Sequence, residues 1–230
     1  MTTIISDEKG HNTGQYLYDN LIPSPDKNLS RFARIFAPRQ GSADDAGQDG
    51  PLGGADAGLG QKDRKDDRFL SGIGITSDKS TSNIKFISLQ GVNIKPCYGC
   101  GGCTEKTFLR CVVRDDADYI LPYIAQSEIV IIVTRITYGG YSFEMKRLAD
   151  KFSPLVTIHY GYKNGELVKG LHDSKLRFFA VGVHDNATGE EQQAFGFLVN
   201  ETLNITRWSG KPLIVKSGTT DIGSVVKEEI

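Results

Sequence analysis

Residues 128–136 read EIVIIVTRI, a nearly unbroken apolar run that indicates the class of fold. A strand in a parallel sheet is covered on both faces, so it carries apolar side chains at successive positions instead of alternate ones. The run leads into the polar turn TYGGYS at 137–142, and then into a segment that places Met145, Leu148 and Phe152 on one helical face. This succession of strand, turn and helix predicts one unit of an α/β fold.

The same succession recurs on both sides of this run. Further strands are predicted at 2–5, 84–89, 176–183 and 211–215, and helices at 13–21, 29–36, 119–125 and 190–203. The alternation predicts a doubly wound α/β domain of three layers, α/β/α, with a parallel sheet of about five strands. In such a sheet, ligands bind at the carboxyl ends of the strands, where the direction of winding reverses.

A change in composition interrupts this pattern. Seven of the twenty residues from Gly41 to Gly60 are glycine, and residues 61–68 form a charge run. Such a stretch buries too little apolar surface to offset its ordering entropy. We therefore expect one domain over residues 1–230, with a flexible Gly/Asp-rich insertion at about 39–68.

The overall composition argues against several classes of function. Lys and Arg number 27 against 28 Asp and Glu, so the chain has no field to attract a polyanion, and we expect no nucleic acid partner. The longest apolar run, 129–133, is far shorter than the roughly 20 residues of a spanning helix, and the N-terminus lacks a signal-peptide pattern. We expect a cytoplasmic protein that does not enter a membrane.

All four cysteines of the chain lie between positions 97 and 111, in the pattern C-x2-C-x2-C-x7-C. The short spacings bring thiolates together on a tight loop, and the glycines at 99, 101 and 102 remove side chains that would obstruct wrapping around a metal centre. The pattern favours an iron–sulfur cluster on Cys97, Cys100, Cys103 and Cys111. A tetrahedral zinc site, redox or flavin-adjacent thiols without metal, and buried free thiols are the alternatives. A disulfide is disfavoured in the cytoplasm.

Three loops occupy the predicted ligand edge, at 6–13, 134–142 and 182–189. The first is rich in small polar residues and precedes a helix, so its backbone N–H groups suit an anion, and Ser6, Asn12 and Thr13 can add donors to a phosphate. Asp7 and Glu8 would repel a phosphate dianion unless they point to solvent. A capped helix with Asn12 or Thr13 as its N-cap is the alternative interpretation.

The second loop carries two tyrosines and two glycines. Gly139 and Gly140 let the backbone approach a flat ring closely, and Tyr138 and Tyr141 offer stacking faces. A hairpin-like turn would also explain the glycines, but the position at the end of a central strand favours a ring site. A histidine lies in each of the other two loops, His11 and His184, where ligand contact, proton transfer and simple solvent exposure all stay open.

Two motifs resemble those of a known family, the flavodoxin-like NAD(P)H-dependent FMN reductases, and within it the iron–sulfur flavoproteins and related multimeric flavodoxins. The motifs are NIKPCYGCGGC at 93–103 with CVVRDD at 111–116, and TYGGYS at 137–142 with Lys146 and Asp150. The resemblance covers about residues 84–155 and continues more weakly through 164–166 and the last strand and helix. The first loop looks like the family's phosphate loop in Ser6, Asn12 and Thr13.

The resemblance implies a flavodoxin-like fold that binds FMN and takes electrons from NAD(P)H. It assigns the FMN phosphate to Ser6, Asn12 and Thr13 and a 4Fe-4S cluster to the four cysteines. The isoalloxazine ring falls to residues of the second loop: Thr134, Ile136, Thr137, Tyr138, Gly139 and Gly140. The chain departs from the family pattern at Ser6-Asp7-Glu8, where Ser-Pro-Arg is usual, and at Thr134-Arg135, where Thr-Pro is usual.

We therefore expect an FMN-dependent oxidoreductase in which reduced nicotinamide gives a hydride to the flavin. Electrons then leave to a small-molecule or protein acceptor, singly where a cluster is present. The resemblance also implies a homodimer or homotetramer. The alternative is a flavodoxin-like electron carrier, or a cofactor-free binding module whose cysteines hold a structural metal. A thiol-based sensor is a third hypothesis.

Overall fold

The computed structural model describes residues 1–7, 75–76, 84–107, 110–169, 174–219 and 228. All of them belong to one compact unit, which comprises residues 1–22 and 67–230. The helices predicted at 13–21 and 29–36 and the insertion predicted at 39–68 lie outside the described residues. The single domain over 1–230 therefore stays a prediction.

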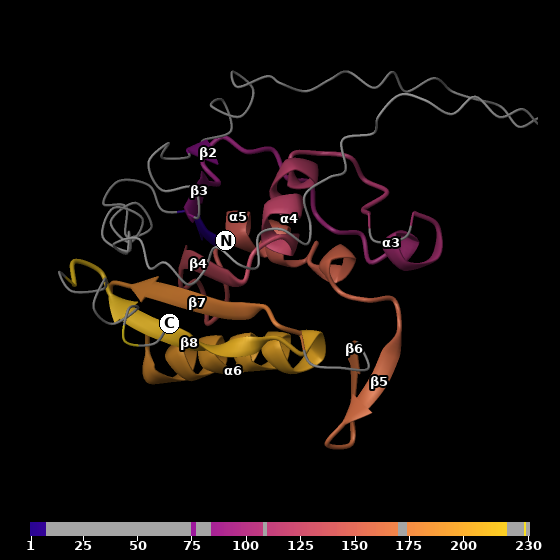
Figure 1. Cartoon of the computed structure of the whole chain (residues 1–230). Helices are drawn as coiled ribbons and strands as arrows, with labels where there is room; N and C mark the ends of the chain where they lie inside the picture. Colours follow the sequence, from indigo (N-terminus) through magenta and orange to yellow (C-terminus); the bar gives the residue numbers. More distant parts are fainter. Residues whose placement is uncertain (8–74, 77–83, 108–109, 170–173, 220–227, 229–230) are drawn as a thin grey trace, which may run out of the picture. The chain divides into compact units, whose positions relative to one another are not determined.

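A six-stranded sheet forms the centre of the described unit (Figure 1). Its order is β2 (Ile75–Thr76), β3 (Ile84–Ser88), β1 (Thr2–Ser6), β4 (Ile129–Arg135), β7 (Arg177–His184) and β8 (Ser209–Lys216). All neighbouring strands pair in parallel except β2, which runs antiparallel to β3 at the edge. The five predicted parallel strands are thus confirmed, and the short edge strand β2 is additional.

The winding reverses at β1. This strand pairs with β3 on one side and β4 on the other, so Ser6 lies opposite both Ser88 and Val133. From β4 the chain continues outward to β7 and β8. For the five parallel strands this is the strand order of flavodoxin-like folds, which place a ligand at the carboxyl ends of the two strands where the order reverses. In this chain those strands are β1 and β4.

Three helices pack on one face of the sheet: α4 (Ala117–Ala125), α5 (Phe143–Ala149) and α6 (Gly189–Thr206). The pattern of the predicted helices is preserved, because Ile120, Met145 and Phe195 are fully buried in this core. Each such side chain contributes about 2 kcal/mol through the apolar surface that it buries. A capping box of Thr188 and Glu191 begins α6, which fixes where this long helix leaves the sheet edge.

A second buried cluster lies on strand residues that point away from this core. Phe86, Ile131 and Phe179 are its larger members and are at most 3% exposed. Burial on alternate sides of β4 explains why its sequence is apolar at successive positions. Side chains of the central strands are therefore buried on both faces of the sheet, as the sequence of β4 predicts.

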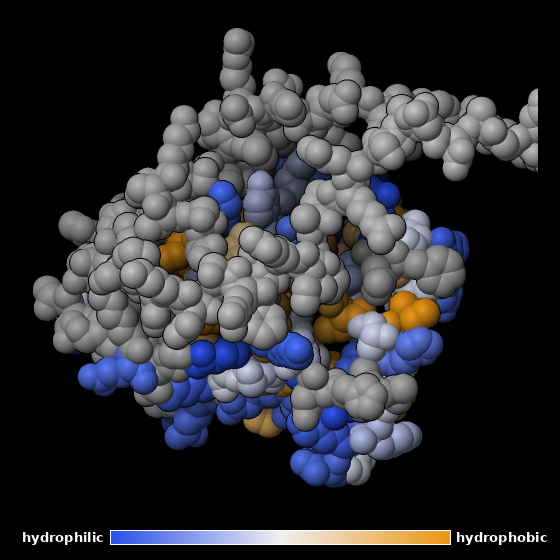
Figure 2. All heavy atoms as spheres, in the orientation of Figure 1, coloured by the Kyte–Doolittle hydropathy of each residue, from blue (hydrophilic) through white to orange (hydrophobic). Residues whose placement is uncertain are grey.

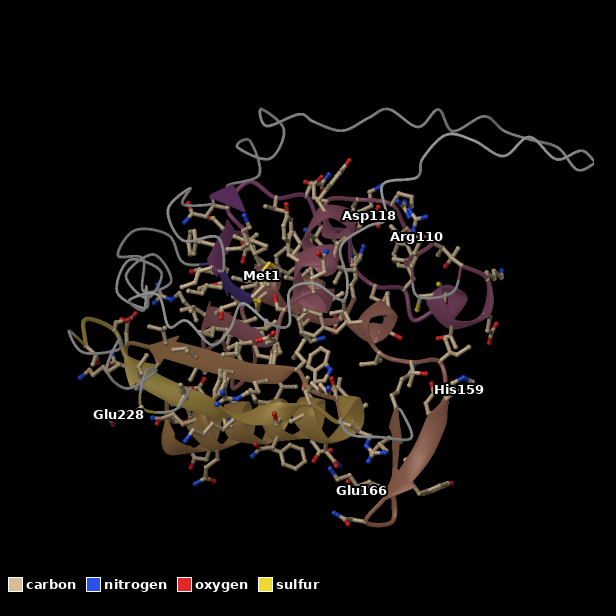
Figure 3. All side chains as sticks on the ribbon, in the orientation of Figure 1. Met1, Arg110, Asp118, His159, Glu166 and Glu228 are labelled. Atoms are coloured by element: carbon tan, nitrogen blue, oxygen red, sulfur yellow. The ribbon has the colours of Figure 1, made fainter. Side chains whose placement is uncertain are left out.

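A two-stranded antiparallel hairpin follows α5, and the sequence interpretation did not include it. It consists of β5 (Tyr160–Lys163) and β6 (Glu166–Lys169), and in Figure 1 it extends away from the central sheet. Figure 3 shows His159 just before β5 and Glu166 just after the turn. Asn164 and Gly165 both have positive φ, as the two central residues of a type I′ turn require. Val168 anchors the hairpin, because it is fully buried.

In Figure 2 the described residues at the bottom of the view, where Figure 1 draws α6, are mostly hydrophilic and appear blue. None of the helices that the structure describes is both long enough and apolar enough to cross a membrane.

Candidate functional site

Asp7 lies immediately after β1, at the point where the winding reverses. Its backbone N–H donates to the carbonyl of Val133 over 3.3 Å, and the residue is only 8% exposed. Its carboxylate oxygen Oδ2 accepts a hydrogen bond from Thr134 Oγ1 at 2.6 Å and another from Ser142 Oγ. Asp7 therefore does not point to solvent, and two hydroxyl groups from the second loop stabilise its charge.

Ser142 connects this carboxylate to a helix. It is the N-cap of α5, and its Oγ accepts a hydrogen bond from the backbone N–H of Met145 at 3.2 Å while donating to Asp7. Its own N–H donates to Thr134 Oγ1 at 3.1 Å. Thr134 is completely buried, so the structure uses its side chain to join β4, β1 and α5.

Residues 137–140 form a tight turn after β4. Thr137 and Gly140 exchange backbone hydrogen bonds of 3.0 and 2.9 Å. The two central residues, Tyr138 and Gly139, have φ of 50° and 75°, as in a type I′ turn. Tyr138 is one of the few non-glycine residues with a left-handed backbone and is 94% exposed. Such a conformation in a large residue is uncommon and concentrates at functional positions.

Gly139 has two structural reasons to be glycine. Its φ lies in the left-handed region, and a Cβ at this position would lie 2.8 Å from the Cβ of Ala194 on α6. The turn therefore packs against the beginning of α6. The hairpin-like turn that the sequence offered as an alternative is present, and it places the ring of Tyr138 outward.

A pocket of about 230 Å³ opens beside this turn, at the carboxyl ends of β4 and β7. It is lined by Arg135, Ile136, Val183, His184, Asp185, Asn186, Ala187 and Glu191. Arg135 and Asp185 form an ion pair across it, with both side chains more than half exposed. A hydrogen bond from the Ser217 side chain and the charge of Arg135 lower the pKa of Asp185, so this carboxylate stays ionised.

His184 lines the same pocket with a defined tautomer. Its Nδ1 accepts a hydrogen bond from the backbone N–H of Ala187 at 3.3 Å, so a neutral ring carries its proton on Nε2. The pocket thus combines a guanidinium, a carboxylate and an imidazole with the apolar side chains of Ile136 and Val183. This combination suits a flat, polar-edged ligand.

Some of the site residues predicted from sequence lie at the pocket or at the turn beside it, and others do not. Ile136 lines the pocket, Thr137 to Gly140 form the turn beside α6, and Thr134 is held by Asp7. Ser6 is 1% exposed at the end of β1, while Asn12 and Thr13 lie outside the described residues. Sequence reasoning gave Arg135 only as a departure from the family pattern and placed Asp185 in the third ligand-edge loop, without assigning either residue a role in the site. The signal available was their position at the ends of two apolar strands.

The cysteine segment, residues 97–111, folds back on itself around Gly102. This residue begins the short helix α3 (Gly102–Glu105), and a Cβ there would lie 2.6 Å from Val112 and 3.4 Å from the sulfur of Cys100. Gly99 and Gly101 adopt left-handed φ of 63° and 67°, a backbone conformation that glycine adopts without strain. Only glycine permits this close approach of both arms of the segment.

The contacts of Cys103 lead to the end of α5 and not to the pocket. Its thiol donates to Ser153 Oγ at 3.6 Å, in the 3-10 helix η2 (Ser153–Leu155), and Lys169 of the hairpin donates to the same oxygen at 3.5 Å. No hydrogen bond or ion pair among the described residues joins the cysteine segment to the pocket at β4 and β7.

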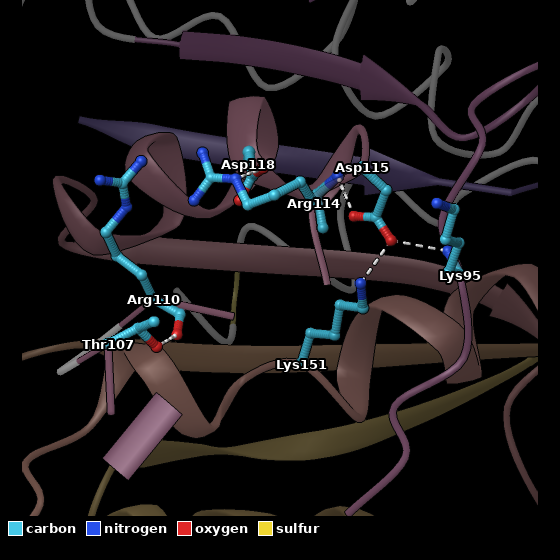
Figure 4. A network of polar contacts seen from close by, with 8 residues as sticks. Lys95, Thr107, Arg110, Arg114, Asp115, Asp118 and Lys151 are labelled. Carbon is cyan, nitrogen blue, oxygen red and sulfur yellow. Dashed lines mark hydrogen bonds and ion pairs between the residues drawn. The ribbon is translucent and has the colours of Figure 1, made fainter. Parts of the chain in front are cut away.

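Two aspartates, Asp115 and Asp116, connect the residues before Cys97 to those after Cys111 by hydrogen bonds. Asp116 Oδ2 accepts from the backbone N–H of Asn93 at 2.8 Å, and Asp115 Oδ2 accepts from that of Lys95 at 2.7 Å. Asp115 also forms an ion pair with Lys151, as Figure 4 shows, and the two side chains are only 2% and 1% exposed. The residues just before Cys97 and just after Cys111 are therefore held together.

The donor set fits an iron–sulfur cluster in its chemistry. All four cysteines are free thiols, and the N–H of Gly99 donates to the sulfur of Cys97 at 3.5 Å, a type of bond that tunes thiolate ligands. In the part of the chain that the structure describes, no three cysteine, histidine, aspartate or glutamate side chains are grouped closely enough to hold a metal ion. The four thiols are thus present, on a segment whose two flanks are held together by Asp115 and Asp116.

The chain is similar to proteins named iron–sulfur flavoproteins. With one from Methanocaldococcus jannaschii it shares 35% identity over 71 residues, which are 31% of this chain and 36% of that relative. With one from Archaeoglobus fulgidus it shares 26% identity over 113 residues, 49% of this chain and 47% of that relative. The chain therefore spans less than half the length of the curated relatives that it matches. No family model matches the chain.

A solved azoreductase structure has a similar fold. It superposes with a TM-score of 0.50 and 9% sequence identity, over 99% of this chain and 92% of that one. At this identity the likeness shows the fold alone. Together with the strand order, it confirms the predicted flavodoxin-like α/β class, and the sequence similarity to iron–sulfur flavoproteins confirms the resemblance seen in the motifs.

Proposed function

We propose that this chain is a flavin-dependent oxidoreductase that binds FMN at the carboxyl ends of β1, β4 and β7, takes electrons from NAD(P)H, and carries an iron–sulfur cluster on its cysteine segment. The observation that carries the proposal is the pocket at the carboxyl ends of β4 and β7, in a chain similar to iron–sulfur flavoproteins. Its lining residue Ile136 lies two positions before Tyr138, which is exposed and has a left-handed backbone.

The residues of the pocket and of the turn after β4 have separate roles in this proposal. Tyr138 provides a ring face for stacking, while Ile136 forms an apolar wall. Arg135 supplies positive charge near the ring, which favours a flavin that gains negative charge when it is reduced. Asp185 holds the guanidinium in place, because its lowered pKa keeps the ion pair intact. The predicted phosphate contacts, Ser6, Asn12 and Thr13, complete the proposed site.

When bound, FMN supplies two-electron exchange with NAD(P)H, and an iron–sulfur cluster supplies transfer of single electrons. Cys97, Cys100, Cys103 and Cys111 would hold the cluster. The acceptor is a small molecule or a protein, and we expect the chain to assemble as a homodimer or homotetramer, which light scattering at several concentrations would measure.

An FMN titration followed by quenching of flavin fluorescence tests the site. We expect Tyr138→Ala to weaken FMN binding about tenfold, because it removes an aromatic stacking contact. Tyr162→Ala is the matched control, since Tyr162 is another tyrosine, 79% exposed, on the distant hairpin. A parent chain that binds no FMN contradicts the proposal, and equal losses in the two variants contradict the location of the ring.

The buried carboxylate of Asp7 favours one alternative, a cofactor-free binding module or electron carrier. A carboxylate at this position opposes a phosphate dianion close to the end of β1. The same titration on Asp7→Asn separates the two functions. FMN affinity that appears only in the variant supports the alternative, whereas strong binding by the parent removes the objection.

A further inference from the structure

Asp115 and Lys151 form a buried pair with no part in the flavin site. Asp115 precedes α4, and Lys151 follows α5, so the pair joins the ends of two helices on the same face of the sheet. With side chains only 2% and 1% exposed, both charges are removed from water (Figure 4). Each charge is neutralised by the other.

Stability alone is a poor explanation for such a pair. Desolvation of two charges costs several kcal/mol, and apolar residues of similar volume are often equally stabilising. The exposed pair of Lys146 and Asp150 on α5 shows that the chain forms ion pairs where desolvation is small. The buried pair therefore needs a role that a hydrophobic contact would not fill.

The distinguishing feature is what else the Asp115 carboxylate accepts. Its Oδ2 accepts a hydrogen bond from the backbone N–H of Lys95 at 2.7 Å, and its Oδ1 accepts one from the backbone N–H of Ala117 at 3.0 Å. Lys95 lies two residues before Cys97, and Asp115 lies four residues after Cys111. One carboxylate therefore fixes both ends of the cysteine segment to each other and to α4. An apolar side chain has no acceptor for either N–H.

We propose that Asp115 and Lys151 are positioning residues for the cysteine segment. By holding its two ends together they favour the gathering of the four thiolates, which the structure does not group closely enough to hold a metal ion, around one iron–sulfur cluster. Lys151 orients the carboxylate through the ion pair, and Asp115 anchors the chain ahead of Cys97. The inference rests on the proposed function, because it assumes the cluster.

The test uses the double variant Asp115→Leu/Lys151→Met in the full chain. It removes both charges together, so no unpaired buried charge is left. The N–H groups of Lys95 and Ala117 lose their acceptor, so we expect a cooperative transition with the melting temperature lowered by no more than about 10 °C. FMN binding should be unchanged. Cluster iron and acid-labile sulfide after anaerobic reconstitution with limiting iron should fall about tenfold, as for other residues that orient metal ligands. The Lys95 amide should exchange its hydrogen faster.

The matched control is Asp150→Leu/Lys146→Met, which removes the exposed pair on α5 and should keep the parent's iron and visible spectrum. Parent-like iron and sulfide in the buried-pair variant would overturn the inference, even where its Lys95 amide exchanges faster. Should the buried-pair variant fail to melt cooperatively, Asp115→Asn/Lys151→Gln replaces it, because it also removes both charges but keeps polar side chains, with a smaller expected loss of iron. A parent chain that takes up no iron overturns the proposed cluster and this inference with it, while FMN binding is scored separately.

Discussion

Asp7 has a structural role that its sequence position alone does not indicate. In the sequence it is an acid in a loop expected to bind phosphate, and its charge is harmless only where it faces solvent. The structure buries it and surrounds Oδ2 with the hydroxyls of Thr134 and Ser142. The carboxylate thus serves to join β1, β4 and α5. A phosphate bound near the end of β1 must be held by other groups, because the charge of Asp7 repels it. The Asp7→Asn titration measures this repulsion.

Tyr141, in the loop after β4, has a pKa raised to about 12, because burial disfavours the phenolate, while the nearby Thr202 side chain opposes the shift. Its ring packs edge-on against Phe195 at 5.7 Å. An unfolded chain would ionise this tyrosine near pH 10, so the folded state loses stability as the pH rises from 10 to 12. We expect the loss from this group to approach about 3 kcal/mol.

Denaturant unfolding of the parent and of Tyr141→Phe at pH 8 to 12 measures this loss. The phenylalanine cannot ionise, so its stability should fall less steeply above pH 10 than that of the parent. Parallel curves for the two proteins would show that the phenol is not protected by burial.

At the scale of elements, the strands and helices that carry apolar periodicity could be predicted. The run at 129–133 predicted β4, and the spacing of Phe195, Val199 and Leu203 predicted α6. The hairpin of β5 and β6 was missed because its strands are short and mostly exposed, so no apolar run marks them. Its signal was the Asn164-Gly165 pair between two alternating segments.

For the candidate site, the sequence predicted the position of the backbone turn but not the pairing of the side chains. The turn at 137–140 was expected from its glycines and from its place after a buried strand. The roles of Arg135 and Asp185 could not be read, since their pairing depends on the register of β4 against β7, which brings Arg135 beside Val183. Asp115 and Lys151 lie 36 positions apart, and their meeting depends on how α4 and α5 pack.

The turn at 137–140 packs closely against α6 at Gly139. We expect Gly139→Ala to destabilise the chain by about 2 to 4 kcal/mol, because it combines an unfavourable positive φ with a clash against Ala194. Gly165→Ala is the control, with a φ of 86° but open space around its Cβ, and it should cost about 1 to 2 kcal/mol. Chemical unfolding of both variants measures the difference, and equal losses would show that the contact with α6 is absent.

At the scale of the whole molecule, the described residues carry two candidate centres on one scaffold. One is the pocket at the carboxyl ends of β4 and β7, and the other is the cysteine segment anchored by Asp115 and Asp116. The polar contacts of the cysteine segment lead to η2 and the hairpin. The central claim is that the first centre holds FMN and the second holds iron and sulfide in the same protein.

Anaerobic purification, followed by a visible absorbance spectrum and by iron and flavin analysis, tests this claim most directly. The account predicts yellow flavin absorbance, either as isolated or after addition of FMN, together with about four iron atoms per chain bound by the four cysteines. Replacing Cys100 by serine should lower the iron and leave the flavin in place. A colourless protein that binds no added FMN and retains no iron would contradict the account.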